Sequence, residues 1–248
     1  MHTAAAAGAR LIHFTEGAIS GYREALTAET DWQGLREELD KTAELAGELG
    51  LWVVAGANHP LTPPHRPHNS LYVISATGHL HGRYDKRLLS FNEVSNWYTP
   101  GVDAFVFDVD GFRFGCALCI EIQFPELFVD YATRGVDVVL LSTYSRNPMF
   151  PILALGHAAC GAFWLSFSVA AQCSEAAAAG LIGPNGQWLA RAPGDGSEAL
   201  VLADLDRTAE ELREALVYAR PWRARSRSGE LHIAARVDDP RSANRLTF

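Results

Sequence analysis

The chain has 248 residues, of which 48% are hydrophobic and 20% are charged, and its formal net charge at pH 7 is −8. This composition is typical of a globular protein with a sizeable core and excludes a disordered chain. The negative charge argues against nucleic acid as a partner, because phosphate binding needs clustered Lys and Arg. No stretch approaches the ~18 apolar residues of a membrane helix, and the start lacks the layout of a signal peptide. We therefore expect a cytoplasmic protein without a membrane partner.

The length is within the range of one large α/β domain, and no linker-like stretch interrupts the composition. We expect one domain over residues 1–248, in which 206–248 form a C-terminal helix and an Arg-rich extension. The Arg-rich stretch "RPWRARSRSG" (220–229) has the pattern of a solvated or interface segment rather than of a nucleic-acid site. The four cysteines are predicted to be thiols, since disulfides are rare in the cytoplasm.

The first half of the chain alternates apolar runs with loops and one helical pattern. "ARLIHFTE" (9–16) is a short apolar run that ends in Glu16, as a buried strand would end at a site. Residues 31–48 have the apolar spacing of a helix. Two further strands are predicted at 51–57 and 69–78, and a long irregular segment at 87–101.

The second half adds a hairpin whose turn is "DVDG", within residues 103–119. Residues 125–135 begin with Pro and end with Gly, the usual boundaries of a helix. Strands alternate with helices, yet several strands join through hairpins, which favours an α/β sandwich with mixed sheets. The remaining predicted elements are a strand at 136–143, a helix at 149–163, and strands within 164–172, 178–192 and 199–206.

Two cysteines, Cys116 and Cys119, are three residues apart in "GCALCI". A zinc or redox pair needs both thiols on one side, whereas positions i and i+3 of a strand face opposite sides. We therefore predict that the two side chains diverge. The histidines cluster mainly in a Pro-rich loop without a carboxylate pair nearby, so no metal site is predicted.

An acid, an amine and a thiol stand at or just beyond the ends of apolar strands: Glu16, Lys86 and Cys119. Only two of the basic residues are lysines, and a compact ammonium can approach one oxygen closely. A carboxylate could take the thiol proton, and the ammonium could lower the thiol pKa and hold an oxyanion. Each residue alone also has an ordinary structural interpretation, so the prediction depends on the three together.

These residues resemble the motifs of the carbon–nitrogen hydrolase (nitrilase) superfamily, from Ala4 to about Leu205. "GARLIHFTEGAISGY", "GRYDKRLL" and "CALCIEIQFPELFVDYATRGVDVVLLST" are similar to its three motifs. The resemblance implies a catalytic triad of Glu16 as general base, Lys86 as catalytic ammonium and Cys119 as nucleophile.

The resemblance also implies an α-β-β-α sandwich with two mixed β-sheets, no metal or organic cofactor, and a homodimer or larger assembly. "FNEVSNWYTPG" is similar to a segment that carries a second glutamate, here Glu93, which would position Lys86. The backbone N–H of Ile120 would help to hold the oxyanion. Trp97, Tyr144 and Phe150 are candidate pocket walls, although they could equally be core aromatics.

The implied function is thiol-dependent hydrolysis of a small amide or N-carbamoyl compound through a thioester on cysteine. Nitrile hydrolysis, acyl transfer and a catalytically impaired binding homologue are the alternatives. Thr15 replaces a usual proline, and Cys160 and Gly161 replace a usual Glu and Asn. Relative to the family, the chain begins after a first strand and most of a first helix, so either it is internal to a longer protein or the sheet lacks a strand.

Overall fold

The computed structural model describes residues 1–22 and 30–246, and within them two mixed β-sheets form the centre of the fold. In the first sheet the strand order is β1-β2-β3-β4; β1 and β2 are parallel and the later neighbours are antiparallel. In the second sheet the order is β10-β9-β8-β7-β6-β5, with β6, β7 and β8 parallel.

Two parallel strands that are adjacent in a sheet need a crossover connection, and helices form these connections here. Helix α2 connects β1 to β2; the Asp31 side chain accepts a hydrogen bond from the Gly34 N–H at 2.8 Å at its start, and Gly50 ends it with φ 60°. The first-sheet elements are α1 (His2–Ala6), β1 (Leu11–His13), α2 (Trp32–Leu49), β2 (Trp52–His59), β3 (His68–Ile74) and β4 (Leu80–Asp85).

The second sheet begins with the predicted hairpin, whose turn residues Asp110 and Gly111 have φ 49° and 81°, as a type I′ turn requires. Helices α3 and α4 cross between its parallel strands. Its elements are β5 (Val106–Val109), β6 (Phe112–Leu118), α3 (Pro125–Thr133), β7 (Val138–Thr143), α4 (Met149–Gly161), β8 (Trp164–Val169), β9 (Gly180–Ile182) and β10 (Trp188–Arg191).

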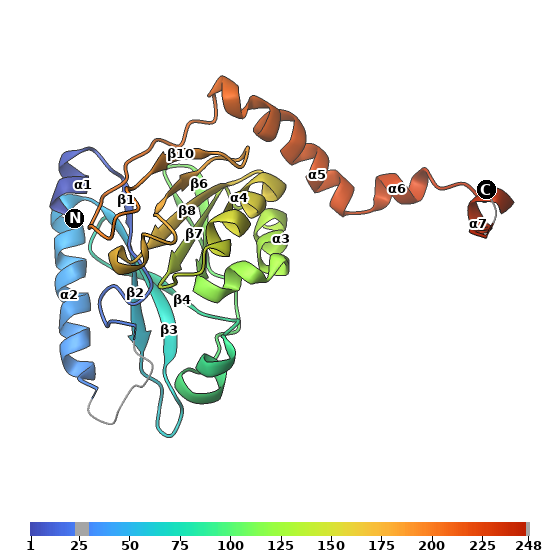
Figure 1. Ribbon diagram of the computed structural model, residues 1–248. Helices are drawn as coiled ribbons and strands as arrows, with labels where there is room; N and C mark the ends of the chain where they lie inside the picture. The colour runs from blue at the N-terminus through green and yellow to red at the C-terminus, as the bar shows by residue number, and fades with distance from the viewer. Residues whose placement is uncertain (23–29, 247–248) are drawn as a thin grey trace.

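The layers follow the order helix, sheet, sheet, helix (Figure 1). Helices α1 and α2 cover the outer face of the first sheet, and α3 and α4 cover the second. Three apolar clusters fill the interfaces: one under α2 with Ala46 and Val53, one between the sheets with Leu71 and Leu140, and one under α3 and α4. The predicted α-β-β-α sandwich is therefore confirmed.

One strand was not predicted and one strand prediction was wrong. Residues 80–85 form β4, which the sequence did not indicate because only Tyr84 is buried in this polar edge strand. Residues 199–206 were predicted to be a strand, but they form no ladder with any described neighbour. An apolar pattern alone does not make a strand, because a strand needs a paired edge.

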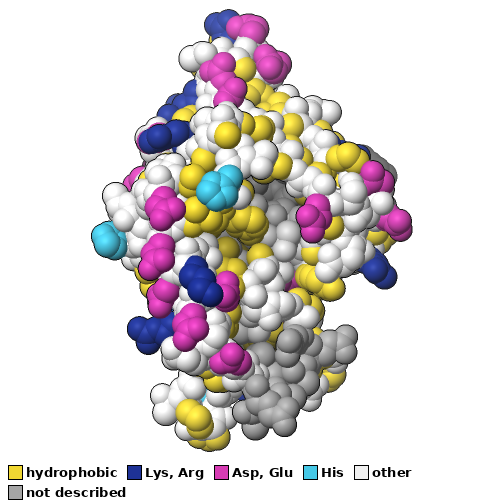
Figure 2. Space-filling model, turned by 90° about the vertical axis from the view of Figure 1, so that its left-hand side faces the viewer, with side chains coloured by type: hydrophobic (Ala, Val, Ile, Leu, Met, Phe, Trp, Pro, Cys, Tyr) yellow, Lys and Arg dark blue, Asp and Glu magenta, His cyan; other side chains and the backbone are white. Residues whose placement is uncertain are grey.

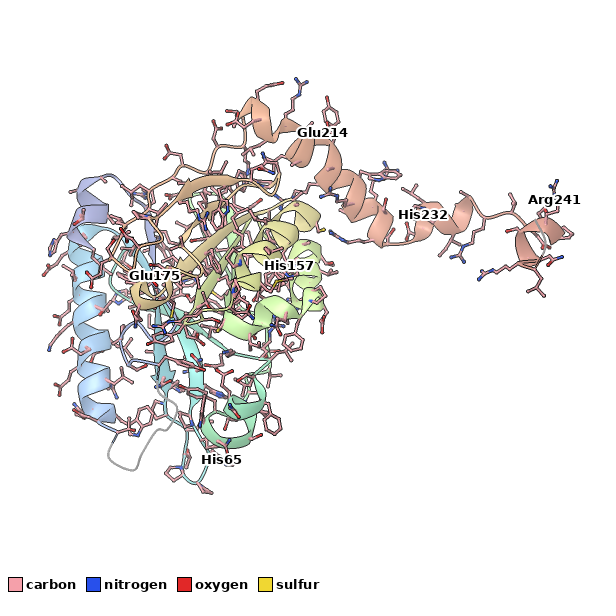
Figure 3. The ribbon with its side chains drawn as sticks, viewed as in Figure 1. His65, His157, Glu175, Glu214, His232 and Arg241 are labelled. Atoms are coloured by element: carbon pink, nitrogen blue, oxygen red, sulfur yellow. The ribbon has the colours of Figure 1, made fainter. Side chains whose placement is uncertain are left out.

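The C-terminal residues form a tail that projects from the sandwich, and His232 and Arg241 lie on it far from the sheets (Figure 3). Its elements are η4 (Glu210–Leu212), the π-helix η5 (Glu214–Ala219), α5 (Arg220–Arg227), α6 (Glu230–Ala234) and α7 (Pro240–Ala243). In the described parts of the chain, no helix combines the length and the hydropathy needed to span a bilayer.

The arginines of α5 bind the body of the protein. Arg223 donates to the carbonyl of Ala159, and Arg227 donates to the carbonyl of Cys160 at 3.0 Å. Both carbonyls belong to the last turn of α4, where unpaired carbonyls and the helix dipole favour a cation. The Arg-rich stretch therefore has an intramolecular role.

Asp137 ties the tail to the second sheet. Its carboxylate accepts hydrogen bonds from Arg207 at 2.9 Å and Arg220 at 2.7 Å, and from the backbone N–H of Arg113 at 2.9 Å. Asp137 is 8% exposed, so little water screens these contacts.

We expect Asp137→Asn to lower the free energy of unfolding by about 1–3 kcal/mol, because it leaves two guanidinium groups without their carboxylate. Urea denaturation followed by circular dichroism measures this change. The control is Asp108→Asn, which breaks the exposed pair with Arg113 and should cost less than about 1 kcal/mol. Equal losses in the two variants would contradict the role given to Asp137.

Candidate active site

The predicted acid, Glu16, lies three residues beyond β1 and is 1% exposed. Its Oε1 accepts hydrogen bonds from Asn69 Nδ2 at 2.8 Å and from Lys86 Nζ at 3.0 Å. Its Oε2 accepts one from the backbone N–H of Tyr144 at 2.9 Å. Donors from both sheets therefore hold this carboxylate in one orientation.

Lys86 directly follows β4 and is also 1% exposed. Its Nζ donates to Glu16 at 3.0 Å and to Glu93 Oε1 at 2.7 Å. Burial by itself would lower the pKa of this ammonium, but Glu16, Cys119 and Glu93 outweigh burial and raise the pKa well above its usual value. Lys86 is therefore a permanent cation at neutral pH.

Glu93 begins the π-helix η1 (Glu93–Trp97) and completes the charged cluster. Its Oε2 accepts from the backbone N–H of Ser90 at 2.8 Å, and its Oε1 accepts from the Tyr22 hydroxyl at 3.2 Å. Burial acts to raise the pKa of Glu93, but the Lys86 ammonium and the Ser90 hydrogen bonds lower it below its usual value. Glu93 therefore stays ionised beside Lys86.

Cys119 stands at the turn between β6 and the 3₁₀ helix η2 (Cys119–Gln123), with φ 50°. A positive φ is uncommon for a residue with a side chain and marks a strained turn. The hydroxyl of Thr143, the last residue of β7, donates to Sγ at 3.3 Å. The N–H of Ile120 is in the first turn of η2, where N–H groups lack partners within the helix.

The thiol of Cys119 is 8% exposed, and burial is the largest of the effects that raise its pKa to about 12. Glu16 raises the pKa further, whereas Lys86 and Thr143 lower it. We expected the Lys86 ammonium to lower the pKa of the Cys119 thiol. It does lower this pKa, but burial and Glu16 together raise the pKa by more. The Cys119 thiol of the resting site is therefore protonated.

The predicted divergence of the two cysteines is confirmed. Cys116 lies within β6 and packs between the two sheets, in the cluster that contains Leu118. Cys119 belongs to the cluster under α3 and α4. Both are free thiols.

Glu121 is the acid nearest to Cys119 in sequence, and its carboxylate has a structural role. It is fully buried, and its carboxylate accepts from the backbone N–H groups of Arg87 at 2.7 Å, Leu88 at 3.1 Å and Leu118 at 2.7 Å. The Tyr84 hydroxyl donates to it as well, at 2.7 Å. Glu121 thus joins the segment after Lys86 to the residue before Cys119.

His157 connects α4 to the 3₁₀ helix η2, which begins at Cys119. Its Nε2–H donates to the carbonyl of Ile122 at 2.8 Å, and its ring stacks on Phe128 at a centroid distance of 3.9 Å. Cys160, which replaces a usual Glu, is exposed. A Cβ on Gly161 would clash with the Phe163 ring, so a side chain at this position requires the ring to move.

The three predicted pocket walls differ in their surroundings. Tyr144 is half-buried and stacks on Tyr22, whose hydroxyl contacts Glu93. Phe150 is buried in the cluster under α4. Trp97 is half-buried at the end of η1, and the next residue, Tyr98, is the one that interacts with Glu16 and Glu93.

Sequence reasoning missed the polar side chains that orient the site. The side chains of Asn69 and Thr143 donate to Glu16 and Cys119, respectively, and the Ser90 hydroxyl accepts from the backbone N–H of Glu93. Asn69 and Thr143 lie at strand ends, which is a signal for sites but is shared by many polar residues. Their partners became evident only when the strands were placed side by side.

Metal binding has no support among the described residues, where no group of three or more His, Cys, Asp or Glu side chains could hold an ion. His59 and His68 stack at a centroid distance of 6.5 Å, and His59 contacts the Tyr72 hydroxyl at 2.7 Å. His65 lies at the end of the molecule opposite to β10 (Figure 3).

A family model described as carbon–nitrogen hydrolase matches residues 1–214. The chain therefore belongs to the carbon–nitrogen hydrolase family.

Two kinds of curated relative are similar to the chain. Hydrolase MT0498 of Mycobacterium tuberculosis (strain CDC 1551 / Oshkosh) is 30% identical over 148 residues, which cover 55% of this chain and 50% of that protein. The chain thus spans about half of the length of this relative. The 2-oxoglutaramate amidase of Bacillus subtilis (strain 168) is 26% identical over 209 residues, or 76% of this chain and 74% of that protein.

Among solved structures, the amidase from Nesterenkonia sp. AN1 has a similar fold. One mutant, which shows covalent addition of the acetamide moiety of fluoroacetamide at its active site cysteine, aligns with a TM-score of 0.76 at 20% identity. The alignment covers 94% of this chain and 86% of that one. At this identity the likeness shows the nitrilase-like fold.

We expect Glu121→Gln to lower the free energy of unfolding by about 2–4 kcal/mol, because the amide group would point a donor at buried N–H groups. Chemical denaturation measures this loss. Tyr84→Phe removes one donor and leaves the carboxylate in place, so it should cost about 1 kcal/mol. A change within about 0.5 kcal/mol for Glu121→Gln would contradict the structural role.

The raised pKa of Cys119 predicts slow alkylation of the free enzyme. A pKa of about 12 favours the protonated form, so the reactive thiolate is scarce at neutral pH and increases as the pH rises towards this value. Iodoacetamide should label the exposed Cys160 faster than Cys119 at neutral pH. Peptide mapping by mass spectrometry reads both sites, and faster labelling of Cys119 would contradict the protonated resting state.

Proposed function

We propose that the chain hydrolyses a non-peptide carbon–nitrogen bond of a small amide or N-carbamoyl compound, with Cys119 as nucleophile, Glu16 as general base and Lys86 as electrostatic catalyst. The observation that carries this proposal is the buried cluster in which Lys86 Nζ lies 3.0 Å from Glu16 and 2.7 Å from Glu93, next to the Cys119 thiol. Family membership supports the reaction type.

In the first half of the reaction, Cys119 Sγ attacks the carbonyl carbon while its proton passes to Glu16. The oxyanion forms near Lys86 and the N–H of Ile120, two donors that act on the transition state. Glu16 then gives the proton to the leaving nitrogen, the carbon–nitrogen bond breaks, and an amine or ammonia leaves a thioester on Cys119.

In the second half, Glu16 takes a proton from water, which attacks the thioester carbon. The carbon–sulfur bond breaks, the acid product leaves, and the proton returns to Cys119. The reaction consumes one water, and the chain's own residues supply every proton transfer.

Charge balance explains why the thiol stays protonated at rest. Glu16, Glu93 and Lys86 together carry a net charge of −1, so an additional thiolate would make the buried site −2. Transfer of the proton from Cys119 to Glu16 leaves the total unchanged. Attack and proton transfer are therefore expected to occur together.

The preference for amides has support from the relatives. One curated relative is a 2-oxoglutaramate amidase, and the Nesterenkonia amidase has been solved with butyramide and with acrylamide. Nitrile hydrolysis and acyl transfer would use the same thioester chemistry, and a catalytically impaired binding protein remains the alternative without turnover.

The projecting tail supports a homodimer, which we propose as the cytoplasmic form. Val217, Tyr218 and Trp222 on η5 and α5 are each more than half exposed. Apolar side chains of this size on a projecting helix would be buried against a second copy.

We expect Cys119→Ala and Glu16→Gln each to lower kcat/KM at least about 10³-fold, because each removes a group that acts only in the transition state. Ammonia release from a panel of small amides, N-carbamoyl amino acids and nitriles measures the activity. Cys160→Ala, which removes an exposed thiol, should leave it unchanged.

Parallel assays with an added amine acceptor distinguish hydrolysis from acyl transfer. Full activity of the Cys119→Ala variant would overturn the assigned nucleophile. If the folded chain released no ammonia and formed no thioester with any member of the panel, the binding homologue would replace the enzyme.

A further inference from the structure

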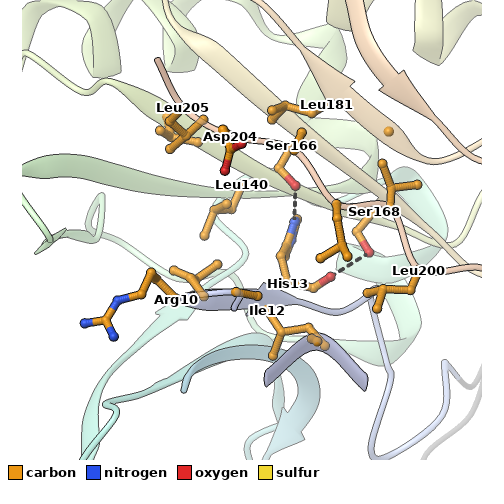
Figure 4. A pocket seen from close by; sticks show the side chains of 18 of the residues that line it. Arg10, Ile12, His13, Leu140, Ser166, Ser168, Leu181, Leu200, Asp204 and Leu205 are labelled. Atoms are coloured by element: carbon orange, nitrogen blue, oxygen red, sulfur yellow. Dashed lines mark hydrogen bonds between the residues drawn. The ribbon is translucent and has the colours of Figure 1, made fainter. Parts of the chain in front are cut away.

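A histidine of the first sheet contacts serines of the second sheet beside the apolar cluster between them. His13, the last residue of β1, faces Ser142 of β7 and Ser166 of β8. It lines a cavity of about 400 Å³, as do Leu140 and Leu181 (Figure 4). On the face of the molecule that carries α1 and α2, hydrophobic side chains gather around a hollow (Figure 2). A hydrogen bond inside a protein is electrostatically stronger than one in water.

The direction of these hydrogen bonds follows from the proton of each group. Burial lowers the pKa of His13 to about 3, so its ring is neutral at pH 7. Ser142 donates its only hydroxyl proton to the Phe14 carbonyl at 2.7 Å, so its oxygen accepts from His13 Nε2–H, also at 2.7 Å. Nδ1 then has no proton and accepts from the Ser166 hydroxyl at 2.9 Å. The one ring proton of His13 is therefore directed at Ser142.

Serine hydroxyls of the second sheet hold the backbone that leads to Glu16. Ser142 donates to the Phe14 carbonyl, and Ser168 of β8 donates to the His13 carbonyl at 3.3 Å (Figure 4). These two carbonyls precede Glu16 by two and three residues. The second sheet therefore holds the end of β1 at the point where the chain turns towards the candidate base.

The first sheet contacts the same backbone from the other side. A Cβ on Gly56 of β2 would clash with the Thr15 carbonyl and with Glu16 Cα, so the two segments are in direct contact. The Ile19 N–H donates to the Gly56 carbonyl at 2.9 Å. Because β2 blocks one direction of movement, the contacts from the second sheet decide how closely the Glu16 backbone is held.

Ser142 and Thr143 are consecutive in β7, and successive side chains of a strand face opposite sides. Ser142 contacts the end of β1, whereas Thr143 donates to Cys119 Sγ at 3.3 Å. One dipeptide therefore contacts both the strand that leads to Glu16 and the thiol. A shift of Ser142 relative to β1 changes the separation of carboxylate and thiol, and a misplacement of about 1 Å can cost on the order of 10²-fold in rate.

We propose that His13 is a positioning residue for the general base. Its Nε2–H keeps the Ser142 hydroxyl on the Phe14 carbonyl. This contact sets the position of Glu16 relative to Cys119. The inference rests on the proposed function, because it gives His13 a role in the same reaction. His13 acts through Ser142 and contacts neither the substrate nor the reacting atoms.

The first test compares two variants of His13 by ammonia release. His13→Phe keeps an aromatic ring but has no donor, so kcat should fall at least about tenfold while KM changes less than about threefold, because the base acts in the transition state. His13→Gln keeps an amide donor towards Ser142 and should restore kcat to within about threefold of the parent. An unchanged kcat in His13→Phe would overturn the proposal.

Ser142→Ala gives the same test with a smaller change, and it replaces His13→Phe if that variant does not fold. It removes the contact with the Phe14 carbonyl and should lower kcat at least about tenfold. The matched control is Ser174→Ala, which removes another buried serine hydroxyl, one that accepts from the Gly196 N–H at 3.0 Å. The control should keep the parent kcat, and equal losses in the two serine variants would overturn the proposal.

Hydrogen exchange measured by NMR tests the position of Glu16 without turnover. The Tyr144 N–H donates to Glu16 Oε2, so it should exchange at least about tenfold faster in His13→Phe and in Ser142→Ala than in the parent. The Trp164 N–H donates to the Asp137 carbonyl at the other end of β8 and should exchange at the parent rate.

The exchange rates separate this inference from the proposed function. Unchanged exchange at Tyr144, or equal acceleration at Tyr144 and Trp164, would overturn the positioning role of His13. A parent protein that releases no ammonia would overturn the proposed function, and faster exchange at Tyr144 alone would then still support the placement of Glu16 through His13.

Discussion

The buried contact of Lys86 with Glu16 and Glu93 is the interaction on which the rest of the site depends. One ammonium holds two carboxylates that would otherwise repel each other, in a place where all three side chains are 1% exposed. Such a cluster is stable only when every charge is paired, since an isolated buried charge is costly. The same cluster acts on Cys119, because Glu16 adds to the effect of burial and raises the pKa of its thiol, whereas Lys86 lowers it.

The sandwich brings these groups together from distant parts of the chain. Glu16 follows β1 and Lys86 follows β4, the two edge strands of the first sheet, whereas Cys119 follows β6 in the second. The geometry of the candidate site therefore requires both sheets in register. Glu121 ties the Lys86 segment to the end of β6, and Ser142 ties β7 to the backbone of Phe14. Loss of packing between the sheets would separate the acid from the thiol.

Part of this arrangement was predictable from the sequence. Glu16 and Cys119 were found at the ends of apolar runs, whereas the roles of these residues and of Lys86 came from the family resemblance, and the divergence of Cys116 followed from strand geometry. Glu93 came from the family resemblance alone, because nothing in a π-helix of five residues marks it. Asn69 and Thr143 could not be recognised, since their roles depend on neighbours across the sheets. The pKa of Cys119 was misjudged because burial is not readable from sequence, and residues 199–206 were mistaken for a strand because pairing is not readable either.

The central claim is that Cys119 carries the acyl group, and the most direct measurement is the mass of the enzyme during turnover. A reaction with a small amide, quenched in acid before the steady state, should give protein whose mass has increased by the acyl group. Peptide mapping should locate this group on Cys119, and it should disappear when the substrate is exhausted. An acyl group on another residue would contradict the account. Ammonia release by the parent enzyme without any acylated protein would contradict it as well.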